Sequence, residues 1–192
     1  DIRPPERSYR ELTRRIRPGD ILTHLFGPTW KSVVDGKVNP DLIAARKRGV
    51  ICDVGHGAGS FSFLNAVPAF EQGFLPDSIS SDLYGANING IVVNLTNVMS
   101  KFLAVGMSLE EVIRCTTINP AREINRPELG TLSAGSTADI SVLRTATGKD
   151  GFTFLDVRRN KRRGEKKIVC AMTVFGGNVV FDHEGIYSNA AR

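Results

Sequence analysis

Residues 50–57 read VICDVGHG, a short apolar segment that runs into glycine and histidine. Two other stretches have a similar form, DILTHLF at residues 20–26 and SISSDL at residues 78–83. Short apolar runs bounded by turn residues are typical of buried strands. Helical segments are expected around and between them, at residues 9–16, 40–48, 61–72, 95–105 and 108–117. This alternation of strands and helices indicates an α/β protein built from parallel βα units.

A side chain of the kind that binds metals lies near the end of each predicted strand: His24, His56 and Asp82. In a (β/α)₈ barrel, the C-terminal ends of successive strands converge on one mouth, where active sites lie. Two imidazoles and a carboxylate are suitable ligands for zinc or a similar divalent ion. We therefore predict a metal site formed by all three. Each also has a more ordinary interpretation, as a buried hydrogen-bonded histidine or as a cap of the following segment.

The pattern changes after Gly130. The segments that follow read as strands separated by turns, without helical periodicity, at residues 139–144, 152–157, 168–175 and 179–181. We place a boundary near residue 133, with an α/β part at 1–133 and a small β part at 134–192. His183 falls in the β part and is expected to be a surface residue.

Several segments resemble the amidohydrolase superfamily. DVGHGAGSFSF (53–63), followed by LPDSISSDLYG (75–85), is similar to strands six to eight of that barrel, and closest to its deacetylase and dihydroorotase-like branch. EEVIRCTTINPAREI and LGTLSAGSTADISVL (within 110–143) resemble the segment through which the chain leaves the barrel and enters a small β-sandwich. MTVFGGNVVF (172–181) resembles the last hairpin of that sandwich. The resemblance covers most of the chain.

This resemblance implies the C-terminal half of a (β/α)₈ TIM-type barrel, about strands five to eight, followed by strands of a small β-sandwich. It implies a metal-dependent, deacetylase-like amidohydrolase that cleaves a C–N or ester bond of a small acylated substrate, such as an N-acetyl amino acid, by means of a metal-activated hydroxide. His24 and His56 would bind one metal of a pair. Asp82 would bind the other metal and transfer the proton. The expected cofactor is a divalent metal, zinc, with two ions in the complete enzyme.

Two parts of the superfamily's metal site are absent from the sequence. No HxH motif occurs, and residues 1–23 contain no lysine that could become the bridging carboxylated ligand. The first four strands are therefore expected in a missing N-terminal half, which the chain needs as a partner, and we expect the chain alone to be inactive. The alternative is a non-catalytic fragment or pseudo-enzyme that acts in assembly. The sequence leaves open the substrate, the metal and whether the protein is a homo-oligomer.

Five further residues are candidates for contact with substrate. Gly57 and Gly59 would let the backbone approach metals and substrate closely. Tyr84, Asn87 and Asn89 follow Asp82 and offer a hydroxyl and two amides, although Asn-Ile-Asn-Gly is also favourable turn chemistry. The HGAG segment at 56–59 also fits the oxyanion loop of an α/β-hydrolase, but no G-x-S-x-G elbow occurs. No G-K-[ST] follows to make a phosphate loop.

The net charge of +5 is concentrated in one run, RRNKRRGEKK at residues 158–167, which holds seven basic residues and one acidic residue. Because the run contains no aromatic residue, we interpret it as a solvated hairpin loop rather than a nucleic-acid site. The sequence contains no apolar run of the roughly 20 residues that a membrane span needs, and it does not open on a signal peptide. Three scattered cysteines without a CxxC pair indicate free thiols in a reducing compartment, and we expect a cytoplasmic protein.

Overall fold

The parallel segments that carry the candidate site residues lie side by side. The computed structural model describes residues 7–185 and 187. In it, β1 (Ile21–Leu22) pairs in parallel with β4 (Ile51–Cys52). Residues 78–81 continue the sheet on the other side of β4, because the amides of residues 54, 56 and 57 donate to the carbonyls of 78, 80 and 81, each over 3.1 Å. The predicted parallel arrangement is therefore observed, although the regular ladder is shorter than expected.

The helices begin where the sequence supplies caps. Ser8 and Glu11 form a capping box at the start of the first helix, and Ser108 and Glu111 form another. The helices are α1 (Tyr9–Arg15), α2 (Pro40–Lys47), α3 (Phe63–Glu71), α4 (Leu95–Val105), α5 (Leu109–Arg114) and α6 (Ile118–Glu123), followed by a 3₁₀ turn, η1 (Pro127–Gly130). Each helical segment expected from the sequence is present, and α4 has the expected bounds. No described helix combines the length and apolarity that crossing a membrane takes.

A small hairpin escaped the sequence analysis. β2 (Val33–Val34) and β3 (Lys37–Val38) pair in antiparallel fashion around Asp35 and Gly36. Both turn residues have positive φ, 49° and 73°, as a tight two-residue hairpin turn requires. Strands of two residues give too little periodicity to be recognised, but the Asp-Gly pair is a signal that the sequence does contain.

The C-terminal part is a three-stranded antiparallel sheet in the order β5 (Ile140–Leu155), β6 (Lys161–Phe175), β7 (Asn178–Asp182). Two predictions need correction. Residues 139–144 and 152–157 are not separate strands, since β5 runs through them with a bulge near Thr147. The basic run is not a loop either, because its residues from 161 onward lie in β6 and pair with β5. Only the turn at 156–160 connects the two strands.

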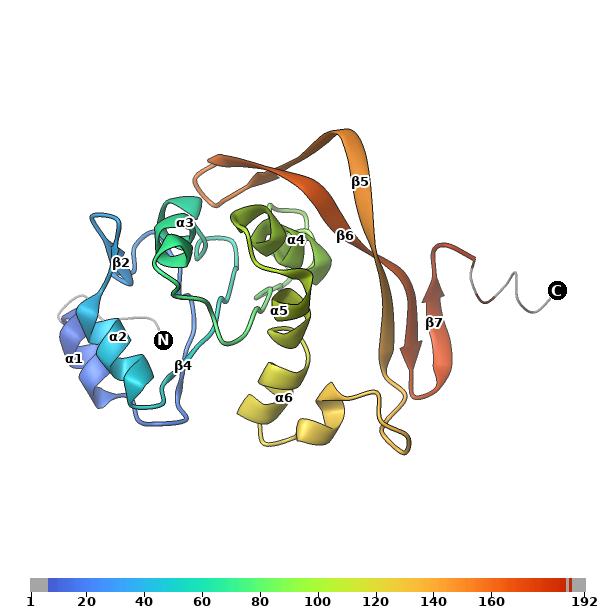
Figure 1. Ribbon diagram of the computed structural model, residues 1–192, viewed down its shortest axis with the longest axis horizontal. Coiled ribbons are helices and arrows are strands. Elements are labelled where there is room, and N and C mark those ends of the chain that lie inside the picture. Colours follow the sequence, from blue (N-terminus) through green and yellow to red (C-terminus); the bar gives the residue numbers. More distant parts are fainter. Residues whose placement is uncertain (1–6, 186, 188–192) are drawn as a thin grey trace.

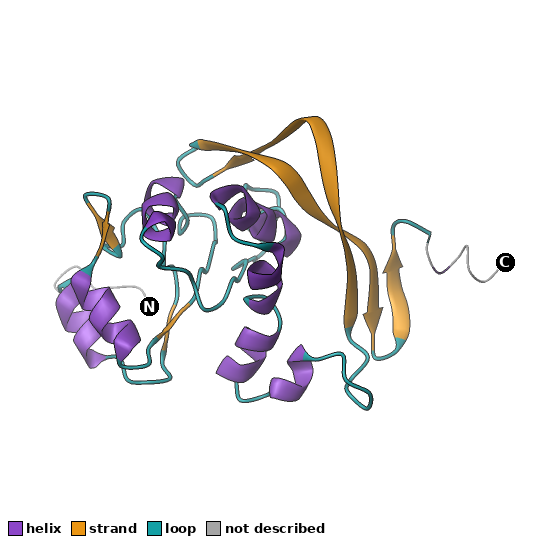
Figure 2. Ribbon diagram, viewed as in Figure 1, coloured by secondary structure: helices purple, strands orange, loops and turns teal. Residues whose placement is uncertain are grey.

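The long hairpin formed by β5 and β6 arches over α4, and its turn lies beside α3 (Figures 1 and 2). Its packing is apolar, because Phe154 and Ile168 are fully buried in the same core as the aromatic side chains of the α/β part. In that core the ring of Phe61 lies 5.6 Å from that of Phe102 and 6.3 Å from that of Phe26, both edge-on. The hairpin is therefore part of the fold around the candidate site. The three cysteines are free thiols, as predicted.

Candidate functional site

His24 and Asp82 meet at the ends of two parallel segments. His24 Nε2 lies 3.5 Å from Asp82 Oδ2, and the two side chains are 20% and 47% exposed. Both residues have positive φ, 61° and 47°, a conformation that is unusual for residues other than glycine. Such backbone geometry persists where the surroundings enforce it and is concentrated at functional sites. The pair is accessible from solvent and chemically suited to a cation.

Two glycines allow the strand ends to approach one another. A Cβ at Gly57 would lie 2.4 Å from Asp82 Oδ2. A Cβ at Gly55 would lie 2.2 Å from Thr23 Oγ1 and 2.7 Å from His24 Cδ2. Both glycines have positive φ, 46° and 48°. Gly57 therefore has the close-approach role expected from the sequence, but toward Asp82, whereas no atom of another residue lies within 4 Å of a Cβ built at Gly59.

The carboxylate of Asp53 ties the three parallel segments together beneath this pair. It accepts hydrogen bonds from the hydroxyls of Thr23 (2.7 Å), Ser78 (2.8 Å) and Ser80 (2.6 Å). Asp53 is 8% exposed, and charge-assisted hydrogen bonds are strong in such surroundings. Thr23 precedes His24 directly, so the network fixes the strand end that presents the imidazole. The sequence analysis missed this network, whose only signal was an aspartate inside an apolar strand.

His56 occupies a different environment from the one expected. Its side chain is buried and stacks on Phe61, with ring centroids 4.7 Å apart. Nδ1 lies 2.9 Å from the carbonyl oxygen of Gly57, and Nε2 lies 2.7 Å from Lys101 Nζ. Lys101, on α4, is also buried and donates to the carbonyl of Ile91 over 3.0 Å. His24 and Asp82 therefore lie together, whereas both ring nitrogens of His56, expected to share a metal with His24, already have protein partners.

The electrostatics of the buried pair favour a neutral imidazole. Burial, and after it the charge of Lys101, lowers the pKa of His56 to about 3. Burial also lowers the pKa of Lys101 to about 8. A neutral His56 that donates from Nδ1 to Gly57 keeps Nε2 free to accept from Lys101. Lys101 was not predicted as part of the site, because it lies within an apolar helix.

Of the remaining candidate residues, Asn87 holds the loop that follows Asp82, and the others are exposed to solvent. Asn87 is buried, and its amide nitrogen donates to the carbonyl of Asp82 over 2.8 Å while its amide oxygen accepts from the backbone of Tyr84. Its amide therefore holds the loop that carries Asp82. Tyr84 and Asn89 are exposed. His183 is exposed as expected and stacks on Phe181.

Trp30 is a further aromatic residue at the site. Its ring centroid lies 6.4 Å from that of His24, with a tilt of 46°. Gly27 makes this position available, because a Cβ there would lie 2.3 Å from the indole. The half-buried indole forms an apolar wall beside the imidazole.

Within residues 7–185 and 187, no three histidine, cysteine or carboxylate side chains gather closely enough to hold a metal ion. His24 and Asp82 supply one nitrogen and one carboxylate donor, which suit zinc. A complete zinc site takes three or four protein ligands. The pair therefore fits as part of a metal site and needs further donors.

Comparison with known proteins identifies the family. Residues 57–180 match the model of the Amidohydrolase family. A deacetylase of Brucella anthropi is 40% identical over 143 residues, which are 72% of this chain and 35% of that protein. A deacetylase of Agrobacterium fabrum is 37% identical over 174 residues, covering 85% of this chain and 41% of that protein. The chain spans less than half the length of these relatives.

Solved structures give the same result. An adenine deaminase superposes with a TM-score of 0.86 at 31% identity, over 94% of this chain and 49% of its own. A dihydroorotase superposes with a TM-score of 0.72 at 32% identity, over 91% of this chain and 45% of its own. The parallel segments, the family match and these similarities agree. The chain belongs to the amidohydrolase family.

Proposed function

We propose that this chain contributes part of the metal site of a deacetylase-like hydrolase that acts on an amide or ester bond of a small acylated substrate. The observation that supports this proposal best is the His24–Asp82 pair, which lies at the ends of parallel strands with its two donor atoms 3.5 Å apart. The deacetylase relatives support the choice of bond. An N-acetyl amino acid is the proposed substrate.

His24 and Asp82 would hold a divalent cation, for which zinc is the proposed identity. When bound, such a cation lowers the pKa of water and polarises the substrate carbonyl. Asp82 would accept the proton from the attacking water and return it to the leaving nitrogen or oxygen. Trp30 excludes water on one side of His24, and the Asp53 network keeps the imidazole in position. His56 would support the loop through Gly57 while Lys101 occupies its Nε2.

The ligands beyond this pair would come from another half-barrel, which is the proposed partner of the chain. It would carry the HxH pair and the lysine of the superfamily site and would complete a barrel in which this chain supplies about strands five to eight. A chain with only two convergent donors would hold one ion weakly and turn over little substrate. A non-catalytic role in assembly is the second candidate, and the absence of a three-ligand group from the described residues favours it for the chain alone.

The test is zinc-dependent hydrolysis of N-acetyl amino acids by the chain alone and by the chain joined to an N-terminal half-barrel that supplies the missing ligands. We expect turnover only in the joined protein. His24→Ala and Asp82→Ala should each remove most of it, whereas His183→Ala, at an exposed histidine, should not. Undiminished turnover in either site variant would contradict the proposal. Robust turnover by the chain alone would contradict the need for a partner.

A further inference from the structure

The turn of the long hairpin is fastened to the loops that surround the candidate site. Asp156, which is fully buried, accepts hydrogen bonds from the Ser62 hydroxyl (3.1 Å) and the Phe63 amide (3.0 Å) at the start of α3. The next amide along the turn, that of Val157, donates to the carbonyl of Phe61 over 3.2 Å. These contacts follow directly on the HGAG segment. The turn is therefore held against the α/β part at the side where that segment lies.

This turn presents Arg159 to two neighbouring cavities. One has a volume of about 210 Å³ and is lined by Ala58, Asn87 and Gly90 together with Arg159. The other has a volume of about 350 Å³ and is lined by Asn89 and Asn97 as well as Arg159. Among the described residues, no carboxylate forms an ion pair with this guanidinium. Its backbone has a φ of 65° and is held by a 3.0 Å hydrogen bond to the Asp156 carbonyl.

The smaller cavity adjoins the loops that carry the candidate site. Ala58 follows Gly57, whose backbone closely approaches the Asp82 carboxylate. Asn87 donates to the Asp82 carbonyl over 2.8 Å. Two residues of this cavity's lining are therefore connected to Asp82, Ala58 through Gly57 and Asn87 through its hydrogen bond. The other residues of this lining are uncharged, so Arg159 is its charged residue.

We infer that Arg159 binds the carboxylate of a substrate whose acyl group lies at His24 and Asp82. A planar guanidinium matches a carboxylate in two parallel hydrogen bonds, and this cavity is too small for a macromolecule. The inference rests on the proposed function for the position of the acyl group. It selects N-acyl amino acids with a free carboxylate over their neutral amides. It also assigns the hairpin of the C-terminal sheet a part in substrate recognition.

The chain offers a matched control in Arg158. Both arginines are exposed and adjacent in the same turn, but Arg158 lines neither cavity. Changing either one to glutamine removes the same charge from the same basic run. An effect that depends only on the charge of the run would therefore appear in both variants, and an effect of the cavity only in Arg159→Gln.

The experiment measures equilibrium binding of N-acetylglycine and N-acetylglycinamide to the 192-residue chain by NMR titration, with thermal denaturation to confirm that each variant is folded. We expect Arg159→Gln to weaken binding of the acid by roughly 10- to 100-fold, to leave the amide unchanged, and to differ from Arg158→Gln, which should bind both as the unmodified chain does. Equal losses for acid and amide, equal losses in both variants, or no preference for the acid in the unmodified chain would overturn the inference.

Because binding is read without turnover, the two proposals fail separately. An Arg159-dependent preference for the acid in a protein that does not hydrolyse it would leave the subsite standing and remove the proposed reaction. Hydrolysis that depends on His24 and Asp82 but is equally efficient for Arg159→Gln would support the proposed reaction and contradict the subsite at Arg159.

Discussion

Removing the carboxylate of Asp156 should loosen the long hairpin from the rest of the fold. The side chain accepts five hydrogen bonds, of which those from Ser62 and Phe63 cross to α3 and those from Arg158 and Asn160 close the turn. In Asp156→Ala, the donors within the turn can reach water. The Phe63 amide is left buried without an acceptor, and the Ser62 hydroxyl, which still accepts from the Leu64 amide, loses the acceptor of its own hydrogen.

The magnitude follows from those two donors. Each buried donor left unsatisfied costs about 1–3 kcal/mol, so the loss of acceptor at two donors should lower the free energy of unfolding by about 2–6 kcal/mol. Such a loss is a large fraction of the stability of an ordinary domain. Burial raises the pKa of Asp156, but the hydrogen bonds from Asn160, Phe63 and Arg158 outweigh it and the pKa is lowered overall. A lowered carboxyl pKa means that this stabilisation is present at neutral pH and is lost as the pH falls through the folded pKa.

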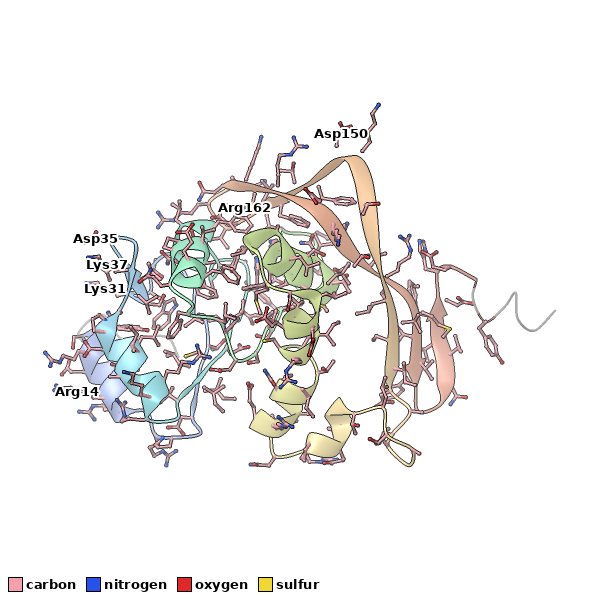
Figure 3. All side chains as sticks on the ribbon, in the orientation of Figure 1. Arg14, Lys31, Asp35, Lys37, Asp150 and Arg162 are labelled. Atoms are coloured by element: carbon pink, nitrogen blue, oxygen red, sulfur yellow. The ribbon has the colours of Figure 1, made fainter. Side chains whose placement is uncertain are left out.

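The assay is urea denaturation combined with amide hydrogen exchange at Val157, whose amide bonds to the Phe61 carbonyl. The control is Asp150→Ala, because Asp150 is exposed at the outer bend of the same hairpin (Figure 3). That variant should change the free energy of unfolding by less than about 0.5 kcal/mol. If Asp156→Ala loses less than about 1 kcal/mol and the amide of Val157 keeps its protection, docking of the hairpin through Asp156 is refuted.

Three further predictions concern Gly57, His56 and Lys101. Gly57→Ala should weaken zinc binding by more than roughly tenfold, because its Cβ would lie 2.4 Å from Asp82 Oδ2. Gly59→Ala, where a Cβ meets open space, should have little effect. Equal zinc affinities of the two variants in isothermal titration would contradict this prediction. The pKa of His56 falls to about 3 in the folded state, so the unfolded state binds more protons between that value and about 6.5. Urea denaturation should therefore show that this group lowers the stability from pH 6.5 downward, by roughly 5 kcal/mol at most. The dependence above about pH 4, where carboxyl groups such as Asp156 do not yet contribute, should disappear in His56→Gln but persist in His183→Gln. Lys101→Met should weaken zinc binding, because His56 loses the partner that helps it to hold the Gly57 loop. Stronger zinc binding in isothermal titration would contradict this role and show that Lys101 blocks a histidine ligand.

The arrangement of the fold was predictable where one local pattern specified one element. Capping boxes and apolar helix faces each act over a few residues, and the helices expected from them are present. The order of the three parallel segments follows from their spacing, because each interval has the length of one βα unit. The small β2–β3 hairpin was recognisable only by its Asp35-Gly36 turn, since strands of two residues have no periodicity.

The environment of His56 could not be predicted from sequence alone. Its partner, Lys101, is 45 residues away on α4, and only packing of that helix against the strand ends brings Nζ to the imidazole. The basic run at residues 158–167 was interpreted as a solvated loop for the same reason, whereas the turn lies at residues 156–160. Its composition is that of a loop, but a buried aspartate and two contacts with α3 fix it in place.

Isothermal titration of the chain with zinc measures directly whether His24 and Asp82 bind a metal ion. We expect one weak site, whose affinity falls by more than roughly tenfold in His24→Ala and in Asp82→Ala. The double variant should bind no more weakly than the poorer single variant, because both residues hold the same ion. His183→Ala should bind as the unmodified chain does. Zinc affinity that is unchanged in both single variants, or lost equally in His183→Ala, would contradict zinc binding by His24 and Asp82.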